Sequence, residues 1–124
     1  KGADGRIAPE HRRHAVATPE ELAAAVGFAP PSPPWLPSGF AARNWAWVES
    51  RQGRAAQILY GDGRGSVSIF FRIGGNEPPP ICPPEGCKDR RGRAVYFGKS
   101  GKFELIVTGD LSPEQMEKVA GLRK

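Results

Sequence analysis

The stretch Ser66-Val67-Ser68-Ile69-Phe70-Phe71-Arg72-Ile73 decides the fold, because its apolar residues recur at every second position. Side chains of a β-strand alternate between its two faces. One face of this stretch therefore carries Val67, Ile69, Phe71 and Ile73, and the other carries Ser66, Ser68, Phe70 and Arg72. A strand with one wholly apolar face predicts a sheet that packs against a core.

Weaker strand patterns lie on both sides of this stretch. Residues 40–50 and 54–60 precede it, and the glycine-rich residues 61–65 predict a hairpin loop before Ser66. After a Pro/Gly-rich loop over residues 74–92, residues 93–97 and 102–108 predict a second hairpin. The sheet should therefore have about five strands, and its short connections favour antiparallel pairing.

Two helix starts bracket the strands. Thr18-Pro19-Glu20-Glu21 and Ser112-Pro113-Glu114-Gln115 both combine a capping hydroxyl, a proline in the first turn and an acidic or amide residue that can close a capping box. We therefore expect an α+β domain over residues 18–124, with an antiparallel sheet and two short helices packed on one face. Residues 1–17 show no apolar period and read as a tail or interdomain linker.

The composition limits the classes of function that this chain can have. The 124 residues suit one domain, and no apolar run reaches the roughly 18 residues that a membrane-spanning helix needs. The net charge of +5 is concentrated in residues 88–102, which hold six Lys or Arg against Asp89 alone. Such a patch suits an acidic protein, a phosphate backbone or an anionic membrane, or is simply a solvated loop and strand edge.

Little in the sequence suggests catalysis. His11 and His14 are the two histidines, no serine has nucleophile-elbow spacing, and the carboxylates lie in turns and at helix starts. We therefore expect no enzymatic activity, no small-molecule substrate, no cofactor and no metal.

The most distinctive local feature of the sequence is a closely spaced cysteine pair, Cys82-Pro83-Pro84-Glu85-Gly86-Cys87. A disulfide between Cys82 and Cys87 would tether the long loop and would imply an oxidising compartment. The alternative, a metal site completed by His11 and His14, has unusual ligand spacing.

Aromatic and arginine residues supply the candidate partner-binding positions. Alternation places Arg43, Trp45 and Trp47 on one strand face, where the tryptophans are either core residues or an exposed anchor for a partner. The same reasoning applies to Phe70 and Arg72 on the second face of the central strand. The remaining candidates come from the basic patch: Arg90, Arg91 and Arg93.

Three pieces of the chain, in order, carry a resemblance. They are Leu36-Pro37-Ser38-Gly39-Phe40, then Ile58–Gly63 followed by Ser66–Phe70, and then Phe103–Val119. Together they resemble the C-terminal domain of the periplasmic sigma-E regulatory proteins, the RseB/MucB family. Residues 18–40 also look like the extracytoplasmic domains of bacterial transmembrane anti-sigma factors. The sequence departs from the first family in the Cys82–Cys87 loop and at Asp62-Gly63-Arg64-Gly65.

The resemblance implies a non-catalytic domain that holds the periplasmic part of a membrane anti-sigma factor in envelope-stress signalling. It also implies an extracytoplasmic location, in the periplasm or cell envelope, and a protein partner, which is that anti-sigma factor or the rest of its own chain. Two other functions stay open on the sequence: an envelope or structural domain of a secreted protein, and a polyanion or nucleic-acid binder that uses residues 88–102.

Overall fold

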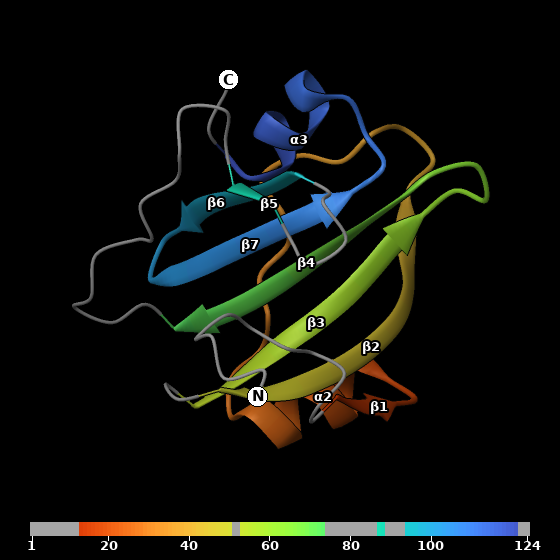
Figure 1. The fold of residues 1–124 in the computed structure, drawn as a ribbon. Helices are drawn as coiled ribbons and strands as arrows, with labels where there is room; N and C mark the ends of the chain where they lie inside the picture. The colour runs from red at the N-terminus through yellow and green to blue at the C-terminus, as the bar shows by residue number, and fades with distance from the viewer. Residues whose placement is uncertain (1–12, 51–52, 74–86, 89–93, 122–124) are drawn as a thin grey trace, which may run out of the picture.

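The chain folds into one antiparallel sheet with two short helices, as the sequence predicts. The computed structural model describes residues 13–50, 53–73, 87–88 and 94–121. Within these residues the strand order is β1-β2-β3-β4-β7-β6-β5, and every neighbouring pair is antiparallel (Figure 1). The α+β class is therefore confirmed.

The elements follow the predicted order closely. The strands are β1 (His14–Val16), β2 (Ala41–Ser50), β3 (Gly53–Gly61), β4 (Ser66–Ile73), β5 (Cys87–Lys88), β6 (Ala94–Ser100) and β7 (Phe103–Gly109). The helices are α2 (Pro19–Val26) and α3 (Pro113–Val119). The five long strands are those expected, and β1 and β5 are additional.

The two short strands correct the sequence analysis. β1 lies within the expected tail and pairs with β2, so residues 14–16 belong to the sheet. β5 lies within the expected loop and pairs with β6 at Ala94 and Val95. Strands of three and two residues are too short to show a period of two, and only their pairing partners reveal them.

Both helices begin at the predicted caps. The Thr18 hydroxyl accepts from the Glu21 N–H at 3.1 Å, whereas the Glu21 carboxylate accepts from the Ala17 N–H, one residue before the cap. In α3 the Ser112 hydroxyl accepts from the Gln115 N–H, and the Gln115 side chain accepts from the Ser112 N–H, which completes the capping box.

The main core lies between the sheet and both helices, on what we call the helix face. Leu22 of α2 and Met116 and Val119 of α3 are at most 2% exposed. They pack in one cluster with buried residues of the central strands: Ala56, Ile58, Tyr60, Val67, Ile69, Phe71, Leu105 and Val107. Both helices therefore cover the same face, as expected. The apolar face predicted for β4 is buried except at Ile73, which is 50% exposed at the end of the strand.

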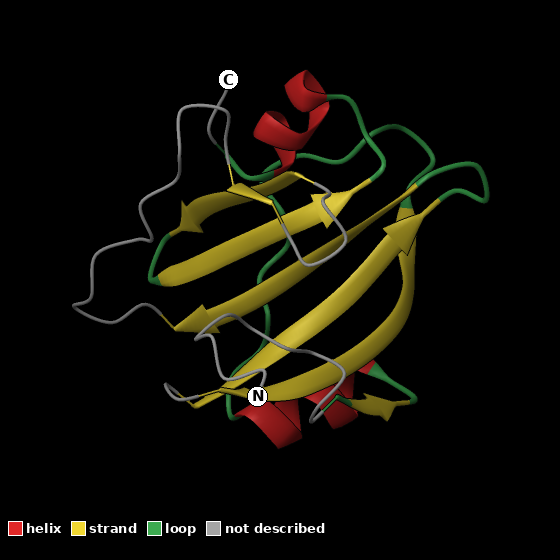
Figure 2. Cartoon of the chain, viewed as in Figure 1, coloured by secondary structure: helices red, strands yellow, loops and turns green. Residues whose placement is uncertain are grey.

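The segment between α2 and β2, residues 27–40, covers the helix face where no helix does. It runs behind the sheet from α2 past α3 to the start of β2 (Figures 1 and 2). Phe28 contacts Phe103 with ring centroids 5.2 Å apart, and the Lys118 ammonium lies 5.0 Å from the Trp35 ring. Phe28, Trp35, Leu36 and Phe40 pack against the main core, so the proline-rich sequence acts as an extended third cover.

The end of α3 rests directly on β6. A Cβ added at Gly98 would overlap the carbonyl oxygen of Ala120, which follows α3. The missing side chain lets the helix end approach the strand backbone, because any larger residue would fill that space. α3 is thereby seated over β6 and β7 (Figure 1).

Candidate interaction surfaces

The face of the sheet opposite the helices, which we call the second face, carries charged residues at one end of its strands and apolar residues next to them. Three rows of residues in register cross β4, β7 and β6. The charged row is Arg72, Glu104 and Lys99; the apolar row is Phe70, Ile106 and Phe97; the third row is Ser68, Thr108 and Val95. Adjacent residues within a row are close enough to interact, so each row behaves as a unit.

The apolar centre of the second face forms a cluster separate from the main core. Val48, Ala55 and Phe70 are at most 7% exposed and form this cluster with the half-buried Ile106. Both helices lie on the other face. The second face thus combines an apolar centre with charged and polar positions along its margins.

The charged row contains an ion pair. The Arg72 Nε lies 2.8 Å from the Glu104 Oε1, and the two side chains are 25% and 18% exposed. Partly solvated pairs of this kind contribute at most about 1 kcal/mol to stability. The ion pair therefore fixes the positions of two surface charges and adds little to the stability of the fold.

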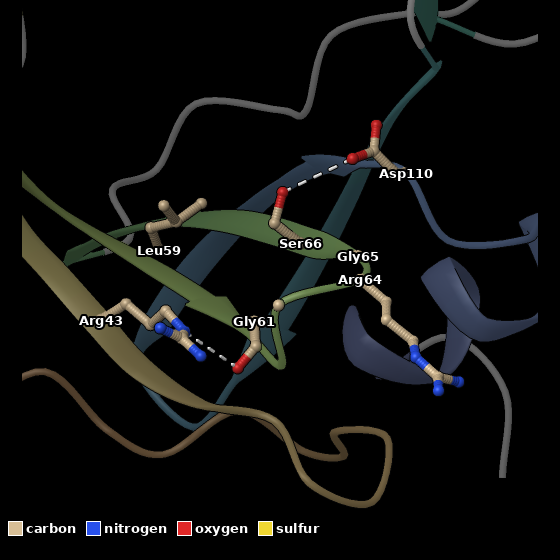
Figure 3. Close-up of a pocket in the computed structure, with 8 residues that line it drawn as sticks. Arg43, Leu59, Gly61, Arg64, Gly65, Ser66 and Asp110 are labelled. Carbon is tan, nitrogen blue, oxygen red and sulfur yellow. Dashed lines mark hydrogen bonds between the residues drawn. The ribbon is translucent and has the colours of Figure 1, made fainter.

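A shallow pocket of about 240 Å³ lies at the end of the sheet where β3 turns into β4 (Figure 3). Its lining residues are Arg43, Leu59, Gly61, Gly63, Arg64, Gly65, Ser66 and Asp110. The Ser66 hydroxyl donates to the Asp110 carboxylate at 3.5 Å. Arg64 points away from Arg43, toward α3 (Figure 3), so the two arginines do not converge on one anion site.

A β-bulge corrects the placement of Arg43. The register of β2 against β3 shifts between Ala42 and Asn44, so Arg43 is the extra residue and the expected alternation breaks there. Its Nε donates to the Gly61 carbonyl at 3.4 Å, and it lines the pocket with Leu59 and Ser66 of the second face. Arg43 is therefore separated from the two tryptophans with which it was grouped.

The hairpin loop beside this pocket holds its carboxylate in a local turn. The Asp62 carboxylate accepts from the Arg64 N–H at 2.8 Å and from the Gly65 N–H at 3.1 Å. These hydrogen bonds to the charged form lower the pKa of Asp62 below its usual value. These two hydrogen bonds explain why an aspartate occupies the hairpin loop that the sequence predicts over residues 61–65.

Trp45 and Trp47 lie on the helix face, half-buried against the main core. The Trp47 ring stacks on His14 of β1 at a centroid distance of 4.1 Å, and the Arg54 guanidinium of β3 lies 4.1 Å from the same ring. Arg54 also donates to the Ala25 carbonyl near the end of α2 at 2.7 Å. Trp47 therefore joins β1, β2, β3 and α2, an arrangement that favours a packing role over an exposed anchor.

The basic patch is described only in part. Arg90, Arg91 and Arg93 lie outside the described residues, as does Cys82. Lys99 is exposed on β6 in register with Glu104, and Lys102 is exposed in the following turn with its ammonium 5.6 Å from the Phe103 ring. Within the described ranges, no group of three or more His, Cys, Asp or Glu residues could hold a metal ion.

Comparison with known proteins assigns no family to this chain. No protein-family model matches it, and no curated protein matches its sequence. In the part of the chain that the structure describes, neither helix is long and apolar enough to cross a membrane.

Proposed function

We propose that this chain is a non-catalytic, extracytoplasmic regulatory domain that binds a partner protein in anti-sigma factor signalling. The observation that carries the proposal is the accessible part of the second face, where the partly exposed Phe97 and Ile106 lie beside the exposed Lys99 and the Arg72–Glu104 ion pair. The signalling context comes from the resemblance of residues 36–122 to the periplasmic sigma-E regulators.

The chemistry of this face suits a protein better than a polyanion. Protein interfaces have an apolar, well-packed centre with charged residues at the margin. The second face has an apolar row of Phe70, Ile106 and Phe97 beside a row that contains both Arg72 and Glu104. A surface for a phosphate backbone would instead present cations without an interleaved carboxylate.

Site-specific photo-crosslinking tests the proposal. A photoreactive residue replaces Ile106, which is half-buried on the second face, and a matched one replaces Ala24, which is exposed on α2. The full chain is then irradiated with solubilised membranes of its source organism. We expect Ile106, and not Ala24, to capture a single-span membrane protein whose cytoplasmic part binds a sigma factor.

Affinity for the captured protein provides the quantitative check. Ile106→Asp should weaken binding of its purified extracytoplasmic part by about tenfold or more, because a charge would be buried at the centre of the interface. Ala24→Asp should leave affinity unchanged. Equal capture from both positions, or a captured protein with no link to a sigma factor, would overturn the proposal.

Two further measurements separate the remaining alternatives. Binding to DNA or anionic vesicles that falls steeply with salt, and that Ile106→Asp does not weaken, would favour the polyanion function instead. The redox state of Cys82 and Cys87 tests the location. If Cys82 and Cys87 are reduced and not joined by a disulfide in material from the native compartment, that result would contradict an extracytoplasmic location.

A further inference from the structure

The shallow pocket where β3 turns into β4 carries opposite charges at its two ends. Eight described residues line it, among them Arg43 of β2 and Asp110, which follows β7. Figure 3 shows these two side chains on opposite sides of Gly61 and Ser66, which are paired across β3 and β4. The pocket therefore runs from a guanidinium to a carboxylate across the end of the sheet.

A β-bulge and one hydrogen bond position the guanidinium at the first end. The bulge takes Arg43 out of the alternation of β2, and its Nε donates to the Gly61 carbonyl at 3.4 Å. A guanidinium has five N–H donors, so the bond through Nε uses one of them and the other four lie on the two terminal nitrogens. A pair of parallel N–H groups on those nitrogens matches the two oxygens of a carboxylate. This end of the pocket therefore suits a carboxylate.

The turn that follows β7 positions the carboxylate at the second end. The Asp110 N–H donates to the Ser66 carbonyl at 3.0 Å, and the Ser66 hydroxyl donates to the Asp110 carboxylate at 3.5 Å. These two hydrogen bonds hold Asp110 at the exposed rim of the pocket. A carboxylate can accept about four hydrogen bonds, so an ammonium group can bind it beside the hydroxyl. This end therefore suits an ammonium group.

The two ends together favour a ligand that carries both charges. A simple anion at Arg43 would be repelled by Asp110, and a simple cation at Asp110 would be repelled by Arg43. A zwitterion meets an opposite charge at each end and avoids both repulsions. Arg64 lines the same pocket but points away toward α3 (Figure 3), so it does not change this balance.

The separation of the two charges sets the length of the ligand. Arg43 bonds to Gly61 and Asp110 bonds to Ser66, and paired strands lie about 5 Å apart. The guanidinium and the carboxylate are therefore roughly 5–10 Å apart. A single α-amino acid is too short, because its two charged groups share one carbon. The termini of an extended peptide of two or three residues are separated by roughly 6–10 Å, at about 3.5 Å per residue.

The size and the walls of the pocket agree with such a small peptide. The volume of about 240 Å³ lies below the roughly 300–1,000 Å³ of sites for drug-sized ligands. Leu59 supplies an apolar wall on which a short side chain can pack. Gly61 and Gly65 supply backbone alone, and a Cβ added at Gly61 would lie only 2.9 Å from the Gly65 carbonyl oxygen. The tight hairpin thus keeps bulky side chains out of this part of the pocket.

We propose that this pocket binds a short zwitterionic peptide of two or three residues, with the terminal carboxylate on Arg43 and the terminal ammonium on Asp110. The peptide is a ligand that is bound and not converted. The inference goes beyond the proposed function, because it concerns a small ligand and not the partner protein. Its test does not depend on whether Ile106 captures that partner.

Titration of alanyl-alanine into the isotopically labelled full chain tests the inference, with amide shifts as the readout. We expect saturable shifts at Gly61, Gly63, Ser66 and Asp110, with a dissociation constant in the millimolar range because the ligand has few atoms. Three altered probes are titrated into the same protein: N-acetyl-alanyl-alanine, alanyl-alanine amide and free alanine. Each should bind about tenfold more weakly, because each loses a charge-assisted hydrogen bond at one end.

Two variants assign the two ends of the ligand. Arg43→Gln should weaken alanyl-alanine by about tenfold and should abolish the preference for alanyl-alanine over its amide. Arg64→Gln removes the same charge from the same pocket lining, and should leave both affinities unchanged. Asp110→Asn should instead abolish the preference over the N-acetyl form. Glu20→Gln, which removes an exposed carboxylate on α2, is its matched control.

The results that would overturn the inference include some that need no variant. Shifts that do not saturate, or blocked peptides that bind the wild-type chain as tightly as alanyl-alanine, would exclude a zwitterion site. Equal affinity for free alanine would refute the length derived from the two charges. Equal loss of affinity in Arg43→Gln and Arg64→Gln would reduce binding to net charge and would refute the role of Arg43.

Discussion

Replacing Gly98 by alanine should destabilise the fold, although alanine is usually at least as favourable as glycine in a strand. An unstrained Gly→Ala change stabilises a protein by about 0.4–1 kcal/mol through the unfolded state. At Gly98 the new Cβ would overlap the carbonyl oxygen of Ala120. The obstacle is backbone, so a change of rotamer cannot relieve it.

The magnitude follows from the two ways in which the structure could respond. Small shifts of a helix to accept an extra methyl group cost about 1–3 kcal/mol. Detaching α3 would instead expose Met116 and Val119, which are at most 2% exposed, at about 1.5–3 kcal/mol each. The shift is the cheaper response, and we expect Gly98→Ala to lower the free energy of unfolding by about 2 kcal/mol.

Urea unfolding followed by tryptophan fluorescence measures this difference, with Gly65→Ala as the matched control. Gly65 has no positive φ, and a Cβ there would meet only the Phe40 ring at 3.9 Å. The control should therefore leave stability unchanged or raise it, by at most about 1 kcal/mol. Adding Ala120→Gly should not rescue Gly98→Ala, because the overlapping oxygen remains. A change below about 0.5 kcal/mol in Gly98→Ala would refute the placement of α3 on β6.

Four other predictions follow from the same structure. Phe71→Ala should cost about 3–5 kcal/mol in urea unfolding, and more than Phe70→Ala, because Phe71 is wholly buried in the larger cluster. Ser112→Ala should lose about 1 kcal/mol as the capping box opens, whereas Ser112→Asp should retain most of the stability in the same assay. The pKa of Asp62 is lowered in the folded state, so the stability that its carboxylate contributes is present above the unfolded pKa of about 4 and is lost as the pH falls through the lowered value. The difference in urea midpoint between the wild type and Asp62→Ala should therefore shrink on acidification. Burial raises the pKa of Tyr60 to about 12, so wild-type stability should fall relative to Tyr60→Phe as pH rises from about 10. Absorbance titration should show a late-ionising component that Tyr60→Phe lacks.

Several elements were determined by the sequence alone. The alternation in Ser66–Ile73 predicted β4 with its bounds, and the caps at Thr18 and Ser112 placed both helices to within a residue or two. These signals are local: side-chain period and capping depend on residues within a few positions of one another. The fold class followed from their order along the chain.

Tertiary structure alone decided the features on which the proposed binding surfaces depend. The bulge that moves Arg43 into the pocket depends on the register between β2 and β3, and the stacking of His14 on Trp47 depends on the pairing of β1. The meeting of Arg72, Glu104 and Lys99 in one row joins three strands, and the seat of α3 at Gly98 joins a helix end to a distant strand. Each is a contact between residues far apart in the sequence, whose positions are set by which strands pair and in what register, and no local pattern encodes that choice.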